Sequence, residues 1–139
     1  EAKFFRGLFY FYLVQLFGPV PMPTDVPDAA YDKDGYPRSA VEDVYQLITD
    51  DLKFAVANLA GKSAMGKGKT NKQAAEALLG KVYLTLKDYT NAKAVLEPLM
   101  TDGDVSLLNN YGDLFTPDNE NNAESLFSVS YSFAADKSA

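Results

Sequence analysis

The chain has 139 residues, of which 47% are hydrophobic, and this length and composition suit one domain with a single core. The formal net charge of −6, without a basic stripe, argues against a nucleic-acid partner. Cysteine and histidine are both absent, which excludes disulfides, thiol or imidazole catalysis and nearly all zinc sites. The longest uninterrupted apolar run, Leu8 to Val14, is too short to cross a membrane.

The ends of the sequence favour an internal piece of a longer protein. Residue 1 is Glu rather than Met, and a helical pattern begins at once with no capping residue before it. We therefore expect any export signal or anchor to lie outside these residues.

The first predicted helix covers residues 1–17. It is apolar on nearly all sides, so we expect neighbours to bury it from several directions. Gly18 and Pro19 end it. Residues 18–38 contain five of the seven prolines and predict a long extended loop. Loops of this length inside a compact domain are usually functional or flexible.

The second predicted helix covers residues 40–60, with Ser39 and Glu42 as a reciprocal capping pair. One of its faces is apolar, and the other carries carboxylates that we expect to face solvent: Glu42, Asp43, Asp50 and Asp51. A catalytic pair needs two carboxyl groups in one cleft with different pKa values. Nothing in this pattern indicates such a pair, so we expect no catalytic residue and no enzyme activity.

Two further helices are predicted at residues 71–87 and 90–100. The pattern assigns Thr70 and Gln73 as the capping pair of the first, and Thr90 as the cap of the second. Pro98 should kink or end the later helix, because proline removes a backbone donor. Farther along, residues 125–133 alternate between apolar and polar side chains, which favours a strand.

A glycine in the middle of a strong helical pattern is the most informative local feature. Gly80 should cost about 1 kcal/mol relative to alanine, so a packing reason is expected. Together with Tyr83 and Ala92 it matches the small, large and small positions of a tetratricopeptide unit. A small residue there lets two antiparallel helices cross closely. We assign three close-packing positions and three groove-filling positions: Gly7, Gly80 and Ala92, and Tyr10, Leu79 and Tyr83.

The residue sequences of four passages, and their order along the chain, identify a protein family more specifically than the tetratricopeptide pattern does. They are EAKFFRGLFYFYLVQLFGPVPMPT, SAVEDVYQLITDDLKFAVANL, TNKQAAEALLGKVYLTLKDYTNAKAVLEPLM and NNYGDLFTPDNENNAESLFSVSYS. Over essentially all 139 residues this series resembles the SusD/RagB family of outer-membrane glycan-capture lipoproteins. The resemblance implies a mainly α fold of tetratricopeptide-like antiparallel hairpins (a SusD-like scaffold), with a short strand near the C-terminal end.

The resemblance also implies a function in nutrient uptake and polysaccharide utilization. Proteins of this family are surface-exposed lipoproteins of Bacteroidota, held at the outer membrane through a lipidated cysteine that would lie outside this sequence. They hand oligosaccharides, or in some members peptides, to a SusC-like TonB-dependent transporter, and they bind without catalysis or cofactor. The helical region serves as their scaffold and faces the transporter. No position here matches a portable ligand-binding motif, so no site residue is carried over.

Short motifs with a possible ligand have simpler interpretations. Residues 61–68 approach a phosphate-binding loop, but Gly68 replaces the required Ser or Thr and a helix precedes the motif, so a flexible linker is favoured. Residues 32–35 and 118–122 approach calcium loops but lack ligands at required positions, which favours Asx turns. A non-standard calcium site is the open alternative, more so for the second stretch; otherwise no metal is expected.

Glycans are usually gripped by aromatic faces, and two interpretations stay open for Tyr31, Tyr36 and Tyr111. Their rings either pack down and anchor their loops, which we favour, or face a sugar. The alternative to glycan capture is a helical-repeat adaptor for protein–protein interaction. That function needs further repeats of about 34 residues, and both the proline-rich loop and the predicted strand count against it.

Overall fold

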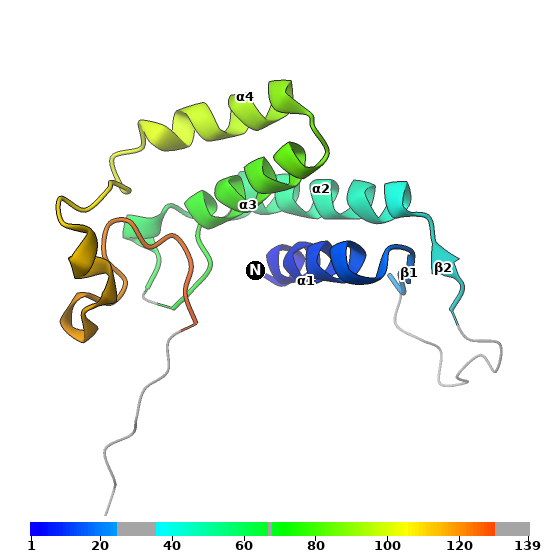
Figure 1. Cartoon of the computed structure of the whole chain (residues 1–139), viewed down its shortest axis with the longest axis horizontal. Helices are drawn as coiled ribbons and strands as arrows, with labels where there is room; N and C mark the ends of the chain where they lie inside the picture. Colours follow the sequence, from blue (N-terminus) through cyan, green and yellow to red (C-terminus); the bar gives the residue numbers. More distant parts are fainter. Residues whose placement is uncertain (25–35, 67, 130–139) are drawn as a thin grey trace, which may run out of the picture.

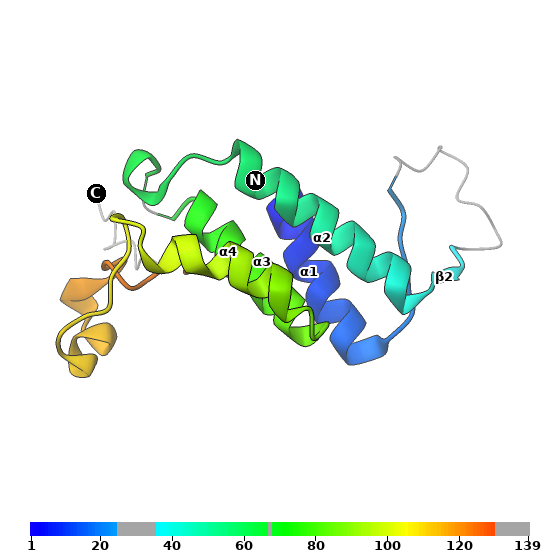
Figure 2. The ribbon, with the colours of Figure 1, turned by 90° about the horizontal axis from the view of Figure 1, so that it is seen from above.

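The computed structural model describes residues 1–24, 36–66 and 68–129. In this part of the chain, four helices pack in chain order, each antiparallel to the next, and we call this array the helical layer (Figures 1 and 2). They are α1 (Ala2–Phe17), α2 (Val41–Asn58), α3 (Lys72–Thr85) and α4 (Tyr89–Met100). The predicted mainly α fold of helical hairpins is therefore confirmed.

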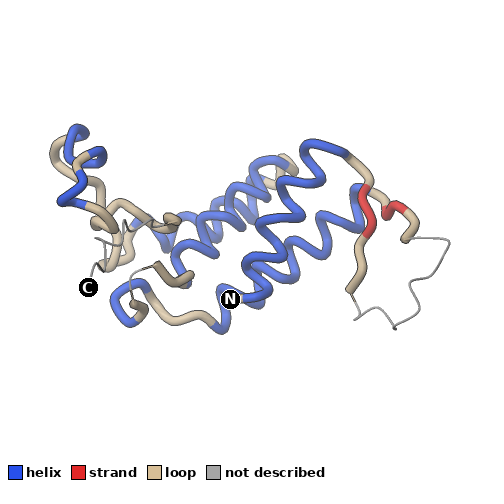
Figure 3. The backbone as a smooth tube through the Cα atoms, turned by 90° about the horizontal axis from the view of Figure 1, so that it is seen from below, coloured by secondary structure: helices blue, strands red, loops and turns tan. Residues whose placement is uncertain are grey.

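The short elements lie at the two ends of this layer (Figure 3). Strands β1 (Val20–Pro21) and β2 (Arg38–Ser39) pair antiparallel at one end and bring the two sides of the proline-rich loop together. Among the described residues, three short 3-10 helices lie at the other end: η1 (Lys62–Ala64), η2 (Tyr111–Phe115) and η3 (Pro117–Asn119).

No strand forms at residues 125–129, the described part of the strand predicted at 125–133. An alternating pattern needs a neighbouring backbone with which to pair. Here the carbonyl of Leu126 instead accepts a hydrogen bond from the side chain of Asn71, at 3.0 Å. Residues 130–133 lie outside the described residues.

The core is a continuous seam between facing helices. Its largest side chains come from α1, α2 and α3. Because α2 packs against both α1 and α3, its inward face is apolar over its whole length. The buried members include Phe4, Phe11, Val14, Val44, Ile48, Leu52, Ala75, Leu79 and Val82.

Two glycines lie where paired helices approach most closely, as predicted. A methyl group added to Gly80 of α3 would stand 2.5 Å from Leu96 Cγ of α4, and one added to Gly7 of α1 would stand 3.1 Å from Leu52 Cγ of α2. Ala92, the third small position, is buried. These contacts confirm that the small residues permit close helix crossing.

Two of the assigned groove fillers, Leu79 and Tyr83, are buried. The third, Tyr10, is half-buried in α1, and its hydroxyl donates to the Pro21 carbonyl at 3.3 Å. It therefore links the helix to β1 as well as packing against the core.

The predicted helix caps are wrong by one or two positions. Ser39 lies in β2 and does not cap α2. Asn71 rather than Thr70 caps α3, and Asp88 rather than Thr90 caps α4. Asn, Asp, Ser and Thr all cap well, so adjacent candidates cannot be ranked by type. Longer-range contacts engage Ser39, which pairs with β1, and Thr70, which bonds to Glu1.

Asp51 is buried, contrary to the expectation that it faces solvent. Its side chain lies against α1, where Asp51 Oδ2 accepts from Arg6 Nε at 2.5 Å and Oδ1 accepts from Arg6 Nη2 at 2.8 Å. Lys3 Nζ lies 3.5 Å from the same carboxylate. The hydrogen bonds to Asp51 raise the pKa of the Arg6 guanidinium. This forked ion pair joins α1 to α2 across 45 residues of sequence.

The adjacent carboxylates of α2 allow a matched test of that ion pair. Asp51→Asn should lower the free energy of unfolding by about 1.5–3 kcal/mol, because it removes hydrogen bonds between charged partners. Asp50→Asn is the control, since the exposed Asp50 carboxylate accepts from Gln46 on the same helix, and it should change stability by less than about 0.5 kcal/mol. Urea unfolding measures both variants. Equal losses would contradict the role assigned to Asp51.

Candidate functional site

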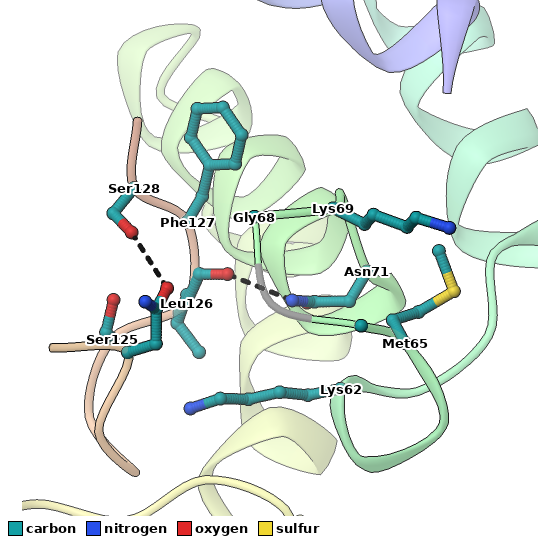
Figure 4. A pocket seen from close by; sticks show the side chains of 11 residues that line it. Lys62, Met65, Gly68, Lys69, Asn71, Ser125, Leu126, Phe127 and Ser128 are labelled. Carbon is teal, nitrogen blue, oxygen red and sulfur yellow. Dashed lines mark hydrogen bonds between the residues drawn. The ribbon is translucent and has the colours of Figure 1, made fainter. Parts of the chain in front are cut away.

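A polar crevice lies between the connection from α2 to α3 and the segment that follows α4 (Figure 4). Its volume is about 100 Å³, which is small for an oligosaccharide. We call it the loop crevice. The side chains that define it are Lys62, Met65, Lys69, Asn71, Leu126 and Phe127.

The loop crevice is closed at its base by hydrogen bonds from two side chains to the backbone. Lys62 Nζ donates to the carbonyls of Asn122 and Ala123, at 2.7 and 3.0 Å. Asn71 Nδ2 donates to the Leu126 carbonyl (Figure 4). Burial lowers the pKa of the Lys62 ammonium, and the nearby Asp104 carboxylate opposes that effect. These contacts hold the segment after α4 against the helical layer.

A second network reinforces the same junction. Gln73, expected to cap its own helix, accepts from the Lys62 backbone N–H at 2.9 Å and donates to Asp102 Oδ2 at 2.9 Å. Asp104 Oδ2 accepts from the backbone N–H and the hydroxyl of Ser63, at 3.2 and 2.8 Å. Hydrogen bonds from the Asp104 N–H and from Gln73 lower the pKa of Asp102. The junction is thus built from side chains of three separate segments.

The motif at residues 61–68 behaves as a connection. It follows α2 and forms the turn η1, whereas a phosphate-binding loop follows a strand. The Lys62 ammonium within it is engaged by the two carbonyls described above. The structure agrees with the linker interpretation.

The stretch at residues 118–122 forms the predicted Asx turn. Asn122 Oδ1 accepts from the backbone N–H groups of Glu124 and Ser125, at 3.0 and 3.1 Å. Within the described ranges no group of three or more acidic or metal-ligating side chains could hold a metal ion. The other candidate stretch, residues 32–35, lies outside those ranges.

The structure describes two of the three candidate tyrosines. Tyr31 lies outside the described residues, and Tyr36 is exposed. Tyr111 is 75% exposed and meets the ring of the exposed Phe115 edge-on, with the ring centroids 5.3 Å apart. The expectation that Tyr111 packs down is therefore not met in the described chain. Tyr36 precedes β2 and Tyr111 begins η2, and these two segments lie at opposite ends of the helical layer (Figure 1).

Sequence reasoning missed Lys62 and Asn71 as residues that hold the junction. Their partners are backbone carbonyls 60 and 55 residues away, and a carbonyl has no sequence signature. The sequence pattern did single out Gln73, but as a capping residue of its own helix and not as part of the junction.

Among the described helices, none has both the length and the apolar character that a membrane crossing requires.

The helix layer, with small residues at its crossings, defines a tetratricopeptide-like hairpin scaffold. A SusD-like family profile described as "starch-binding associating with outer membrane" matches residues 1–84. The chain belongs to this SusD-like family, which confirms the resemblance that the sequence motifs carry.

Three relatives illustrate the likeness. A SusD-like protein of Bacteroides ovatus is 33% identical, over 94% of this chain and 26% of its own length. The crystal structure of a SusD-like carbohydrate binding protein from Bacteroides fragilis is 30% identical, with a TM-score of 0.83 over 91% of this chain and 25% of that one. A laminarin binding SusD-like protein is 33% identical, with a TM-score of 0.81 over 91% and 29% of the two chains. The chain thus spans about a quarter of the length of these relatives.

Removing the ammonium group of Lys62 from the junction should loosen the segment that follows α4. Lys62→Met keeps an unbranched side chain one atom shorter but deletes the donors to two carbonyls, so amide exchange over residues 104–126 should rise about tenfold. Hydrogen–deuterium exchange read by mass spectrometry measures this rise. Lys93→Met, at an exposed position of α4, is the control and should leave that segment unchanged. Identical exchange in the two variants would show that Lys62 does not hold the segment.

Proposed function

We propose that the protein containing this chain captures oligosaccharides at the cell surface and delivers them to a SusC-like TonB-dependent transporter. In this proposal it is an outer-membrane lipoprotein whose lipid anchor lies outside residues 1–139. It binds its ligand and does not catalyse a reaction. Peptide is the alternative ligand class.

The observation that carries the proposal is membership of the SusD-like family together with what its relatives bind. One structural neighbour is described as a carbohydrate binding protein and another as laminarin binding, at 30% and 33% identity. The family description itself names starch binding and the outer membrane. An adaptor built from repeated helices has no comparable support, so glycan capture remains the leading proposal.

Within such a protein, this segment supplies the scaffold. The loop crevice is small and is tied by internal hydrogen bonds. Its exposed aromatic residues at positions 36 and 111 belong to separate segments, one just before β2 and the other in η2, and these segments lie at opposite ends of the helical layer (Figure 1). We therefore assign the main ligand contacts to parts of the protein beyond this segment, and the transporter-facing surface to its helices.

Glycan binding tests the proposal in the complete polypeptide that contains this chain. Isothermal titration calorimetry against starch, laminarin and xyloglucan oligosaccharides should find at least one ligand. Tyr36→Ala and Tyr111→Ala should each change its Kd by less than about twofold, or about 0.4 kcal/mol, because the segment is a scaffold.

Two outcomes would contradict this account. No binding to any glycan of the panel would contradict capture of oligosaccharides. A tenfold weaker Kd in either tyrosine variant would place the ligand on this segment and contradict its role as a scaffold. Co-purification of a barrel transporter from solubilised outer membranes tests the delivery step.

A further inference from the structure

The outward side of α1 carries a continuous row of large apolar side chains. They recur at the i, i+3, i+4, i+7 and i+8 spacing that places residues on one helix face. All are exposed, Leu16 most of all at 74%. We call this row the α1 stripe, and it consists of Phe9, Tyr12, Leu13, Leu16 and Phe17.

The α1 stripe is separate from the core. The residues of α1 that α2 and α3 bury lie on the other side of the helix: Phe4, Gly7, Phe11 and Val14. Figure 1 shows α1 as the lowest of the four helices, with α2 and α3 above it and no described segment beneath it. The expectation that neighbours bury α1 from several directions is therefore met on one side only within the described residues.

The chemistry of the α1 stripe fits an apolar protein surface. Between Gly7 and Phe17 the helix has no charged side chain, and the one amide, Gln15, donates to the Phe11 carbonyl at 2.9 Å. A membrane-surface helix would instead carry basic residues free to reach lipid headgroups. The basic residues of α1, Lys3 and Arg6, pair with Asp51. Contiguous apolar patches of this kind usually mark a surface that another protein segment covers.

The chain itself already covers the beginning of α1. Phe127, far downstream of the helix, meets the rings of Phe4 and Phe5 edge-on, with centroids 5.4 and 6.0 Å apart. Phe5 in turn stacks on Phe9, the first residue of the α1 stripe, at 6.3 Å. Beside these rings, a groove of about 390 Å³ between α1 and α3 is lined mainly by apolar side chains, including Leu8 and Leu78. The polypeptide that follows α4 thus returns to the beginning of α1.

We infer that the α1 stripe is the docking surface for a part of the same polypeptide beyond residue 139. The relatives are about four times as long as this chain, so most of a protein of this kind lies outside it. Stacked helical hairpins cannot bury all their apolar surface alone and depend on further units of the same chain. The occupant presents apolar side chains to α1, continues the cover that Phe127 begins, and makes α1 a central helix of the complete protein.

Thiol labelling tests this docking, since residues 1–139 contain no cysteine. In the complete polypeptide, with cysteines elsewhere replaced by serine, Leu16→Cys should react with a thiol reagent at least tenfold more slowly than it does in urea. Asp50→Cys, on an exposed turn of α2, is the control for reagent access. Phe9→Cys provides a second reporter on the stripe, and circular dichroism verifies that each variant folds.

The inference is supported if the cysteines at positions 9 and 16 are protected from the thiol reagent and this protection does not change when the protein is diluted. Labelling as fast as in urea would overturn the inference. Protection that disappears on dilution together with a dimer mass would assign the stripe to a second copy, and protection only in the presence of phosphatidylcholine vesicles would assign it to lipid. Either result would also overturn the inference. None of these outcomes depends on whether the protein binds a glycan.

Discussion

The close approach of paired helices at glycine is the constraint on which the rest of the structure depends. At Gly80 the side chain of Leu96 occupies the space that a Cβ would need, and at Gly7 a Cβ would meet Leu52 in a tight contact of 3.1 Å. Both pairs belong to antiparallel neighbours. Because backbones approach at these points, the larger residues on either side can fill the grooves and form one continuous seam.

Charged and polar side chains fix the positions of segments that the apolar seam alone does not determine. The pair of Arg6 and Asp51 sets how α1 lies along α2, and Lys62 with Gln73 sets where the chain runs after α4. Each contact joins segments far apart in sequence. The apolar seam holds the layer together, the ion pair aligns two of its helices, and the contacts of Lys62 and Gln73 position the segment at its end.

Helix positions and close-packing residues could be predicted, because period and residue size act locally. The glycine at position 80 conflicted with helix propensity, and that conflict pointed to a crossing. Caps and buried charge could not be predicted in the same way. Thr70, a good capping residue, is buried and its hydroxyl donates to Glu1 Oε1 at 3.3 Å, and Asp51 looks like any solvent-facing carboxylate until Arg6 lies beside it.

The same limit applies to the candidate site. The exposed aromatic and Asx-rich motifs were visible in the sequence, and the Asx turn at Asn122 could be predicted from residue type alone. The junction that holds this segment could not, since Lys62 and Asn71 bind backbone carbonyls. The order and sequence of the four family-like passages pointed to a SusD-like scaffold.

A double-mutant cycle at the helix crossing tests the central claim most directly. In the parent chain Gly80→Ala should lower the free energy of unfolding, although alanine favours a helix by about 1 kcal/mol over glycine. In a Leu96→Ala background, where the space is free, the same change should raise it by up to about 1 kcal/mol. If Gly80→Ala stabilises both backgrounds equally, the close crossing does not exist and the account of the scaffold is wrong.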